Sequence, residues 1–380
     1  MTLEAPSPVA FPRSVLRLCE ALGPSREAAL LLPSLRALDW VMTLPNAAAP
    51  GFAYLGGACR GVPVGGGGRD LTEAAARLAG EAAEVLAQVT EPCLADGPAD
   101  PAIDRIWTAD AGSSARVAAV NLTRGRQVVV PASAIHFDTG FDANRAAEAP
   151  PRSLGLGAGP DRAAARLAGL LELIERDAAF AWWMEGRRPR ALDAVPTAPA
   201  AADLARMRAG AVAPGRPTTF LDLASPTGIT VVCALSRDPG GNGLAFGLKA
   251  GLCPRLAVQG AMIELLQMEM ALELARHRLA QGRDTGSDEG PLRRAALDPD
   301  AFDAFSPLPA AAGEGPSIAG LDDLTAHLAT LGHEVTVADL EGPAAAPLHV
   351  AKVFVPGLRP MPGGAARATR GAPGTEADLM

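Results

Sequence analysis

Lysine, tyrosine and cysteine are scarce in this chain. Its 380 residues include only two lysines and one tyrosine, so nearly all of the positive charge is arginine. The cysteines are Cys19, Cys59, Cys93, Cys233 and Cys253, and no two of them form a Cys-x-x-Cys pair. Their odd number and wide spacing argue against a disulfide framework and against a zinc site. We therefore expect reduced thiols, as in a cytoplasmic protein.

The sequence also lacks a long apolar run. No stretch of about eighteen apolar residues occurs, so no membrane-spanning helix is expected. The N-terminus, Met-Thr-Leu-Glu-Ala-Pro-Ser-Pro, carries an acid and has no apolar core after it, so a secretory signal is not expected either. The hydrophobic content of 48% and the net charge of −8 are typical of a globular protein. The acidic balance argues against nucleic acid as a partner.

The chain does contain a Glu-x-x-Glu pattern that occurs twice, about ninety residues apart. Glu81 and Glu84 stand in one Ala-rich segment, and Glu172 and Glu175 stand in another. Residues three apart project from one face of a helix, so each pair offers two carboxylates on the same side. A single pair is most often a solvated helix face. Two pairs brought together would form an oxygen-rich site suited to Mg²⁺, which leaves its other positions to water and phosphate.

Several widespread catalytic motifs are absent. The sequence has no Gly-x-Ser-x-Gly, no His-Glu-x-x-His, no Walker-type phosphate loop and no Rossmann fingerprint. The five histidines share no motif and are expected to be structural or exposed. Trp182 and Trp183, adjacent on one expected helix, cannot both face one pocket and are predicted to be core or pocket wall. The glycines at 65–68 precede a helix; such a run is usually a flexible turn but can cradle a phosphate with its N–H groups.

The pattern of apolar residues predicts alternating helices and strands without a strict βαβ repeat. Helices are expected over 14–38 (broken at Gly23-Pro24 and at Pro33), 160–186, 255–281 and 320–331. Strands are expected over 115–121, 127–131, 217–223, 229–235, 243–249, 333–339 and 348–355. The expected organisation is an N-terminal helical segment at 1–45, one large domain at 46–362 and a disordered tail at 363–380.

The segments around the glutamates resemble the signature of the YcaO family. The specific block runs from Ser153-Leu-Gly-Leu-Gly-Ala-Gly-Pro160 to Gly169-Leu-Leu-Glu-Leu-Ile-Glu-Arg-Asp-Ala-Ala-Phe-Ala-Trp-Trp183. Three supporting blocks occur in the expected order: Gly66-Gly67-Gly68 with the helix of Glu81 and Glu84, Gly-Leu-Ala-Phe-Gly247 with Glu264 and Gln267, and Val-Phe-Val-Pro356-Gly-Leu-Arg-Pro-Met361. Together the blocks span roughly residues 50–361.

The resemblance implies an α+β fold, a YcaO-like domain with internally duplicated sheet-and-helix halves. It also implies an enzyme that uses ATP and Mg²⁺ to activate a peptide backbone amide. A nucleophile adds to the amide, the oxygen is phosphorylated, and loss of phosphate gives an azoline, or a thioamide when sulfide is the nucleophile, as ribosomally made peptides mature. By the same resemblance Glu81, Glu84, Glu172 and Glu175 would hold the metal. Nucleotide contacts would come from Arg176, Gly66, Gly68, Glu264 and Gln267. No catalytic acid or base is named, and Asp177 offers Arg176 a purely structural partner.

Several positions depart from the family pattern. Arg77, Val85, Pro160, Ala164 and Gly260 stand where the family usually has other side chains, Gly67 replaces a basic residue, and the proline-rich C-terminal end is missing. A partly degenerate nucleotide site is therefore expected. Two alternatives stay open: a catalytically degenerate scaffold or peptide-binding subunit, and a plain metal-dependent hydrolase or phosphotransferase. Because residues 1–45 are too few for the usual leader-peptide-binding domain, a partner protein is expected to deliver a peptide substrate. A homodimer is a further option.

Overall fold

The structure is a computed structural model that describes residues 12–107, 115–137, 152–211, 215–283, 288–310, 316–340, 347–359 and 368–375. Its α-helices are α1 (Arg13–Leu22), α2 (Arg26–Arg36), α3 (Leu71–Val89), α4 (Pro101–Trp107), α5 (Arg162–Trp183), α6 (Ala194–Arg208), α7 (Pro254–Ala280), α8 (Glu289–Ala295) and α9 (Leu321–Thr330). Its strands are β1 (Leu38–Thr43), β2 (Ala53–Cys59), β3 (Val62–Gly68), β4 (Arg116–Asn121), β5 (Arg126–Pro131), β6 (Leu156–Gly159), β7 (Arg190–Ala191), β8 (Thr218–Asp222), β9 (Thr230–Ser236), β10 (Ala245–Gly251), β11 (Thr336–Leu340) and β12 (His349–Phe354).

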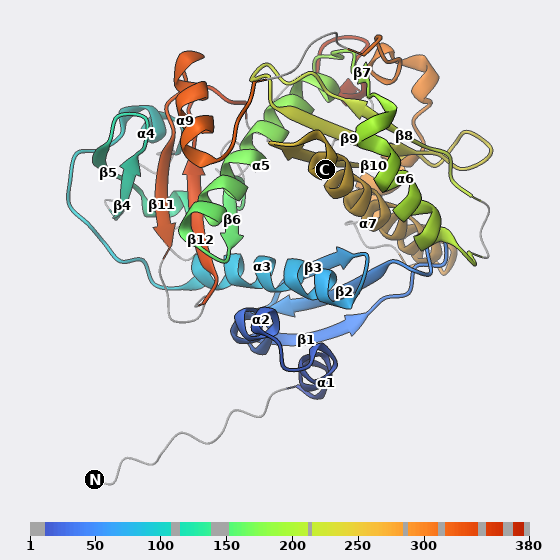
Figure 1. Ribbon diagram of the computed structural model, residues 1–380, viewed down its shortest axis with the longest axis horizontal. Coiled ribbons are helices and arrows are strands. Elements are labelled where there is room, and N and C mark those ends of the chain that lie inside the picture. Colours follow the sequence, from blue (N-terminus) through green and yellow to red (C-terminus); the bar gives the residue numbers. More distant parts are fainter. Residues whose placement is uncertain are drawn as a thin grey trace.

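The strands form three antiparallel sheets, and one long helix packs on each of them (Figure 1). The first sheet has the order β1-β2-β3 with α3, and the second has the order β5-β4-β11-β12-β6 with α5. The third has the order β10-β9-β8-β7 with α7. We call these assemblies the first, second and third units. The second unit is discontinuous, because β11 and β12 follow the third unit in sequence and lie between β4 and β6.

Each long helix also contacts a strand of a neighbouring unit. Helix α3 touches β6, α5 touches β10, and α7 touches β3, so the three units meet in a cyclic order. Figure 1 shows the three helices running around the middle of the molecule. A site built where they meet can draw side chains from positions far apart in the sequence.

The long helices start where the sequence provides a cap. Asp70 accepts a hydrogen bond from the N–H of Glu73, and Asp161 accepts one from the N–H of Ala164. Such side-chain caps satisfy N–H groups that have no partner within the helix. Helix α7 begins instead with Pro254, whose missing N–H and fixed φ suit a first helical turn.

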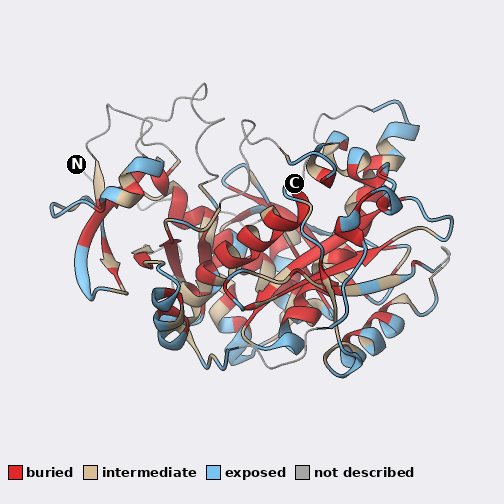
Figure 2. Ribbon diagram, turned by 90° about the horizontal axis from the view of Figure 1, so that it is seen from above, coloured by how far each residue is buried: buried red, intermediate tan, exposed pale blue. Residues whose placement is uncertain are grey.

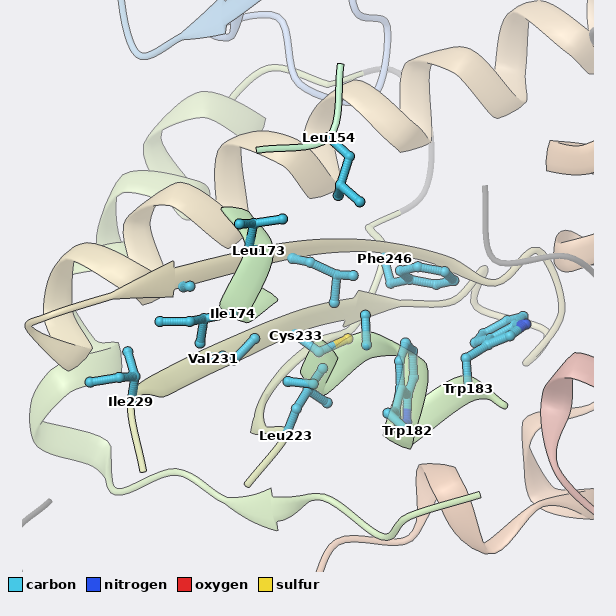
Figure 3. Packing of buried hydrophobic residues seen from close by; sticks show 14 of the residues in the cluster. Leu154, Leu173, Ile174, Trp182, Trp183, Leu223, Ile229, Val231, Cys233 and Phe246 are labelled. Atoms are coloured by element: carbon cyan, nitrogen blue, oxygen red, sulfur yellow. The ribbon is translucent and has the colours of Figure 1, made fainter. Parts of the chain in front are cut away.

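The largest hydrophobic core of the described residues surrounds α5, which packs against the third sheet on one side and against β11, β12 and α9 on the other. Trp182 and Trp183 are both fully buried, and their ring centroids lie 5.2 Å from that of Phe246. The indole N–H of Trp182 donates to the carbonyl of Ala304 at 2.7 Å, which satisfies the one polar group of this side chain. Figure 3 shows both indoles beside Phe246, and Figure 2 shows buried residues throughout the interior of the sheets. Both tryptophans therefore belong to the core.

The N-terminal part of the chain differs from the expected helical segment. Pro33 lies inside α2 and does not break it, and β1, which was not expected, pairs with β2 from Leu38 to Thr43. A boundary at residue 45 would separate β1 from its own sheet. The glycines at 65–68 also differ from expectation, because they lie in β3, paired with β2, and not in a turn.

The expected disorder of the C-terminal tail does not hold for residues 368–375. The N–H of Thr369 donates to the carbonyl of Met184 at 2.7 Å, and Ala372 and Pro373 are buried. This segment therefore packs on the end of α5. The rest of the expected tail lies outside the described residues.

The predicted combination of helices and sheets is confirmed, and every helix and strand expected from residue 115 onward is present with its ends shifted by a few residues at most. Within the described residues no helix is both long enough and apolar enough to cross a membrane.

Candidate functional site

The three units share one spacing between strand and helix. Gly68, Gly159 and Gly251 each end the strand before the long helix, and thirteen residues later each unit has a glutamate: Glu81, Glu172 and Glu264. Sixteen residues after the glycines stand Glu84, Glu175 and Gln267. The third block of the sequence is therefore a structural counterpart of the two Glu-x-x-Glu blocks, with Gln in place of the last Glu.

The first glutamate of each pair is fixed by the backbone of its own unit. Each carboxylate accepts a hydrogen bond from a backbone N–H: Glu81 from Gly65 at 2.8 Å, Glu172 from Gly155 at 2.9 Å and Glu264 from Leu248 at 3.2 Å. A carboxylate held by a backbone N–H has little freedom to turn away. These three acids are therefore oriented before any ligand arrives.

The second residue of each pair reaches toward the next unit. Glu175 accepts from the N–H of Ala250 in β10 at 3.0 Å, and Glu84 is hydrogen-bonded to the backbone of Ala158 in β6. Gln267 lies against β3, where a Cβ added to Gly67 would approach its Nε2 to 2.9 Å. The three pairs thus link the units in the same cyclic order as their helices.

All six of these side chains line one cavity of about 1100 Å³. Arg77, Arg176 and Lys249 line it too, as do Gly65 and Arg152. Of the residues singled out from the sequence, the four Glu-x-x-Glu carboxylates, Arg176, Glu264 and Gln267 are brought together. Gly66 and Gly68 are not among the lining residues: they are buried in β3 against α3, where an added Cβ would meet the helix backbone. None of the five histidines lines the cavity.

Positive charge is distributed unevenly over the carboxylates. Arg176 lies 3.5 Å from Glu172 and 4.0 Å from Glu175, and it does not pair with the adjacent Asp177. Asp177 accepts instead from the backbone N–H of Arg359 at 3.0 Å and from its Nε at 2.7 Å. The structural alternative for Arg176, a pairing with Asp177, is therefore excluded. Arg176 points toward the carboxylates.

Crowding of the acids changes their proton affinity. Burial, together with the charges of Glu172 and Glu81, raises the pKa of Glu84 to about 8. Burial and the charge of Glu175 raise the pKa of Glu264 to about 7. Burial also raises the pKa values of Glu81 and Glu172. These shifts indicate carboxylates that lack enough positive charge nearby, a deficit that a proton or a divalent cation would remove.

The carboxylates do not form a closed metal cage. No three His, Cys, Asp or Glu side chains in the described part of the chain are gathered tightly enough to enclose a metal ion. The donor set nevertheless fits Mg²⁺, since hard oxygen ligands converge on an open cavity with room for water and phosphate oxygens. Arginines at the same cavity fit the phosphates of a nucleotide.

Lys249 and Lys352, the only two lysines, were not selected from the sequence. Lys249 lines the cavity, and Lys352 is bonded to the backbone of Arg152, which lines it too. Lys249 lies in β10 between Glu175 and Glu264. Lys352, in β12, is fully buried and donates to the carbonyls of Arg152 and Leu154 at 2.7 and 2.5 Å. Burial lowers the pKa of Lys352 to about 7. Their rarity in an arginine-rich chain was the signal that could have identified them.

Residues 93–359, more than half of the chain, match the family model described as YcaO cyclodehydratase, ATP- and Mg²⁺-binding. The chain therefore belongs to the YcaO family, and ATP and Mg²⁺ are the cofactors in that family's description. No curated protein matches the sequence significantly.

Solved structures of similar fold are distant in sequence. A heterocyclase in complex with substrate and cofactor matches with a TM-score of 0.67 and 19% identity, over 92% of this chain and 53% of its own length. YcaO from Methanopyrus kandleri, bound with AMPPCP and Mg²⁺, matches with a TM-score of 0.64 and 19% identity, over 93% of this chain and 94% of its own. The E. coli microcin synthetase McbBCD complex with pro-MccB17 bound matches with a TM-score of 0.60 and 15% identity, over 89% and 95%. The likeness establishes the fold, and this chain spans about half the length of the heterocyclase.

Proposed function

We propose that this protein uses ATP and Mg²⁺ to activate a backbone amide oxygen of a ribosomally made peptide, and that the product is an azoline or a thioamide. The observation that carries the proposal is the meeting of four Glu-x-x-Glu carboxylates from α3 and α5 in one cavity with Arg176. Membership of the YcaO family supports the reaction class.

The residues present fit both cofactors. Glu81, Glu84 and Glu172 would hold Mg²⁺, with Glu175 beside them, and Arg176 and Arg77 would contact phosphate oxygens. Bound ATP supplies the phosphoryl group that turns the amide oxygen into a leaving group. The cavity, at about 1100 Å³, lies at the upper end of the volumes of small-molecule sites, which leaves room for a peptide segment beside a nucleotide.

The chain itself contributes positioning and charge. Its carboxylates are held in place by backbone N–H groups at 2.8 and 2.9 Å, so little reorganisation is needed when ligands bind. Arg176 brings a planar fork of donors to the same wall. Holding the reacting groups in line is the main protein contribution to phosphoryl transfer. We assign no general acid or base.

A catalytically degenerate scaffold is the second candidate, and particular side chains favour it. Gly260 and Ala164 have no polar side chain to offer a nucleotide, and Arg77 lies 3.3 Å from Glu73, which neutralises part of its charge. Position 160, where a polar residue is expected, is a proline. The next residue, Asp161, is polar, but it caps α5. A site that binds metal but grips ATP weakly fits these features.

The same proposal includes a cytoplasmic location, because all five cysteines are free. It also includes a partner protein that delivers the peptide. The proposed YcaO-like domain covers residues 46–362, and β1 (Leu38–Thr43) is added to it because β1 pairs with β2. A homodimer is the remaining option for its assembly.

The test is ATP turnover by the purified chain, with and without the candidate precursor peptide encoded beside its gene and the partner encoded there. Peptide-dependent turnover, with loss of water or exchange of oxygen for sulfur in the peptide by mass spectrometry, supports the proposal. Binding of peptide without turnover supports the scaffold. Hydrolysis that ignores the peptide supports a plain hydrolase. The double variant E81Q/E84Q should abolish turnover, and E91Q, at an exposed glutamate beyond α3, should not.

A further inference from the structure

Lys249 breaks the correspondence between the strands of the three units. Two positions before the glycine that ends the strand, the first and second units have Gly66 and Gly157, whereas the third unit has Lys249. An added Cβ at either glycine would meet the backbone of the helix packed on that strand. A long side chain fits at this position only where the facing helix has no side chain in its path.

Helix α7 provides this space at Gly260, which has no side chain. A Cβ added to Gly260 would lie 2.5 Å from Cγ of Lys249, so the lysine side chain occupies the space that a side chain there would need. The corresponding helix positions in the other units, nine residues after the strand-end glycine, carry Arg77 and Ala168. The third unit therefore has its basic group on the strand and a glycine on the helix, and the two features depend on each other.

The ammonium group of Lys249 ends between two carboxylates from different units. Its Nζ lies 3.5 Å from Oε1 of Glu264 and 3.7 Å from Oε2 of Glu175. Glu175 is only 2% exposed, its Oε2 accepts from the N–H of Ala250, and its Oε1 lies 4.0 Å from Arg176. The oxygens of Glu175 are thus already engaged by cations and by the backbone. The charge of Glu175, followed by that of Glu264, raises the pKa of Lys249, so the lysine is cationic.

The opposite end of the cavity has fewer cations paired with its acids. Within the described residues neither Glu81 nor Glu84 has an ion-pair partner, and Glu172 has Arg176 at 3.5 Å. The charge of the buried Lys352 also acts on Glu172 and Glu84 and offsets part of their charge. In the third unit the last acid is also replaced by the neutral Gln267. The negative charge that a divalent cation would bind is therefore concentrated at the end formed by Glu81, Glu84 and Glu172.

We propose that Lys249 takes the place of a cation at the third junction, so that Glu175 and Glu264 hold an ammonium group and divalent ions are confined to Glu81, Glu84 and Glu172. This inference rests on the proposed function in so far as the site binds Mg²⁺ at all. It makes Lys249 a positioning residue with a defined effect: its charge limits the number of metal ions in the site.

The test replaces Lys249 by methionine, which keeps the length of the side chain and removes the charge. Binding of Mn²⁺, in place of Mg²⁺, is counted from the electron paramagnetic resonance signal of the free ion, with and without a non-hydrolysable ATP analogue. K249M should bind about one more ion per chain than the wild type. The affinity for this added ion should be at least about tenfold higher than that of the wild type at the same junction. K249R keeps the charge and should match the wild type, and K249M/E264Q, which removes one of the two freed carboxylates, should lose the added ion.

Thermal unfolding provides a second measurement in case the freed carboxylates destabilise K249M. Added Mg²⁺ should raise the Tm of K249M more than that of the wild type, and K249M/E264Q should lose this extra rise. Equal ion counts and equal Mg²⁺ responses in K249M and the wild type would overturn the inference. If the wild type binds no ion but K249M does, the proposed function fails, together with the confinement of ions to Glu81, Glu84 and Glu172, and only the replacement of a cation by Lys249 at the third junction stands.

Discussion

The raised pKa of Glu84 predicts that the metal-free protein becomes less stable as pH rises. An unfolded glutamate has a pKa near 4.3, whereas in the folded chain burial and two neighbouring carboxylates raise the pKa of Glu84 to about 8. Below about pH 4 both states hold the proton, and the group contributes no difference. Between about pH 4.3 and 8 the unfolded chain releases the proton while the folded chain retains it, so the free energy of unfolding falls.

The size of the effect follows from the shift. Roughly 3.5 pH units at about 1.4 kcal/mol each set an upper limit of about 5 kcal/mol. Sharing of the proton with Glu81 and Glu172 and access of water from the cavity reduce the expected loss to about 2–3 kcal/mol. Replacement of Glu84 by Gln keeps the shape of the side chain and removes the charge. At pH 8.5 the free energy of unfolding of E84Q should therefore exceed that of the wild type by about 2–3 kcal/mol, and at pH 5 the two values should be similar.

Urea unfolding at pH 5 and pH 8.5 in the presence of EDTA measures the difference. The matched control is E91Q, at an exposed glutamate that does not line the cavity. Added Mg²⁺ should reverse the order at pH 8.5, because an ion that binds only the folded state stabilises the wild type and finds one ligand fewer in E84Q. If E84Q without metal is no more stable than the wild type at pH 8.5, the carboxylates are not crowded as described.

Three further changes are expected to have separable effects. Arg176→Lys keeps the charge but loses the planar fork, so calorimetry with Mg-ATP should show about tenfold weaker binding, whereas unchanged affinity would remove Arg176 from the nucleotide site. Arg359→Ala removes the charged partner of the buried Asp177 carboxylate and leaves it only the backbone N–H of residue 359. The change should cost about 2–3 kcal/mol in urea unfolding, and a loss below about 0.5 kcal/mol would show that water replaces the arginine. Gly66→Ala places a Cβ against the backbone of α3 and should lower the free energy of unfolding by about 2–4 kcal/mol. Gly80→Ala, where the added Cβ meets only an ordinary contact at 3.8 Å, should be neutral or stabilising. Similar Tm values for the two variants would contradict this packing.

The sequence predicted the later helices and strands well because their apolar residues follow clear periods. Helix α5, for example, was expected over 160–186 and runs from Arg162 to Trp183. Strand β3 was missed because it reads Val-Pro-Val-Gly-Gly-Gly-Gly, which has the composition of a turn. Its glycines are needed for the close approach of α3, a tertiary requirement that a local pattern does not reveal. Helix α6 was missed because its prolines and alanines give no amphipathic signal.

Sequence reasoning found the carboxylates of the site but not its distribution of charge. Two Glu-x-x-Glu words and a family resemblance were enough to choose Glu81, Glu84, Glu172 and Glu175, which line one cavity. Lys249 was missed because it lies on a strand, fifteen residues before the glutamate that it faces. That pairing exists only because Gly260 opens the helix surface, which is visible in three dimensions alone.

Because β11 and β12 lie between β4 and β6, the second sheet can form only late in the synthesis of the chain. Among the described strands β6 pairs only with β12, and β4 has β11 on the side away from β5. Until both late strands have emerged from the ribosome, each early strand therefore has a bare edge. The first unit, by contrast, contains its whole sheet and helix by residue 89 and can pack at once. Unpaired edges attract other chains. The nascent protein is therefore most prone to aggregate while residues between about 160 and 349 are being made.

Glu172 is fixed by Gly155, in a segment that Lys352 of β12 anchors through the carbonyls of Arg152 and Leu154. Strand β12, which is translated long after β6, thus supports this wall of the cavity. Chains truncated before β12 lack this anchor and should bind ATP poorly.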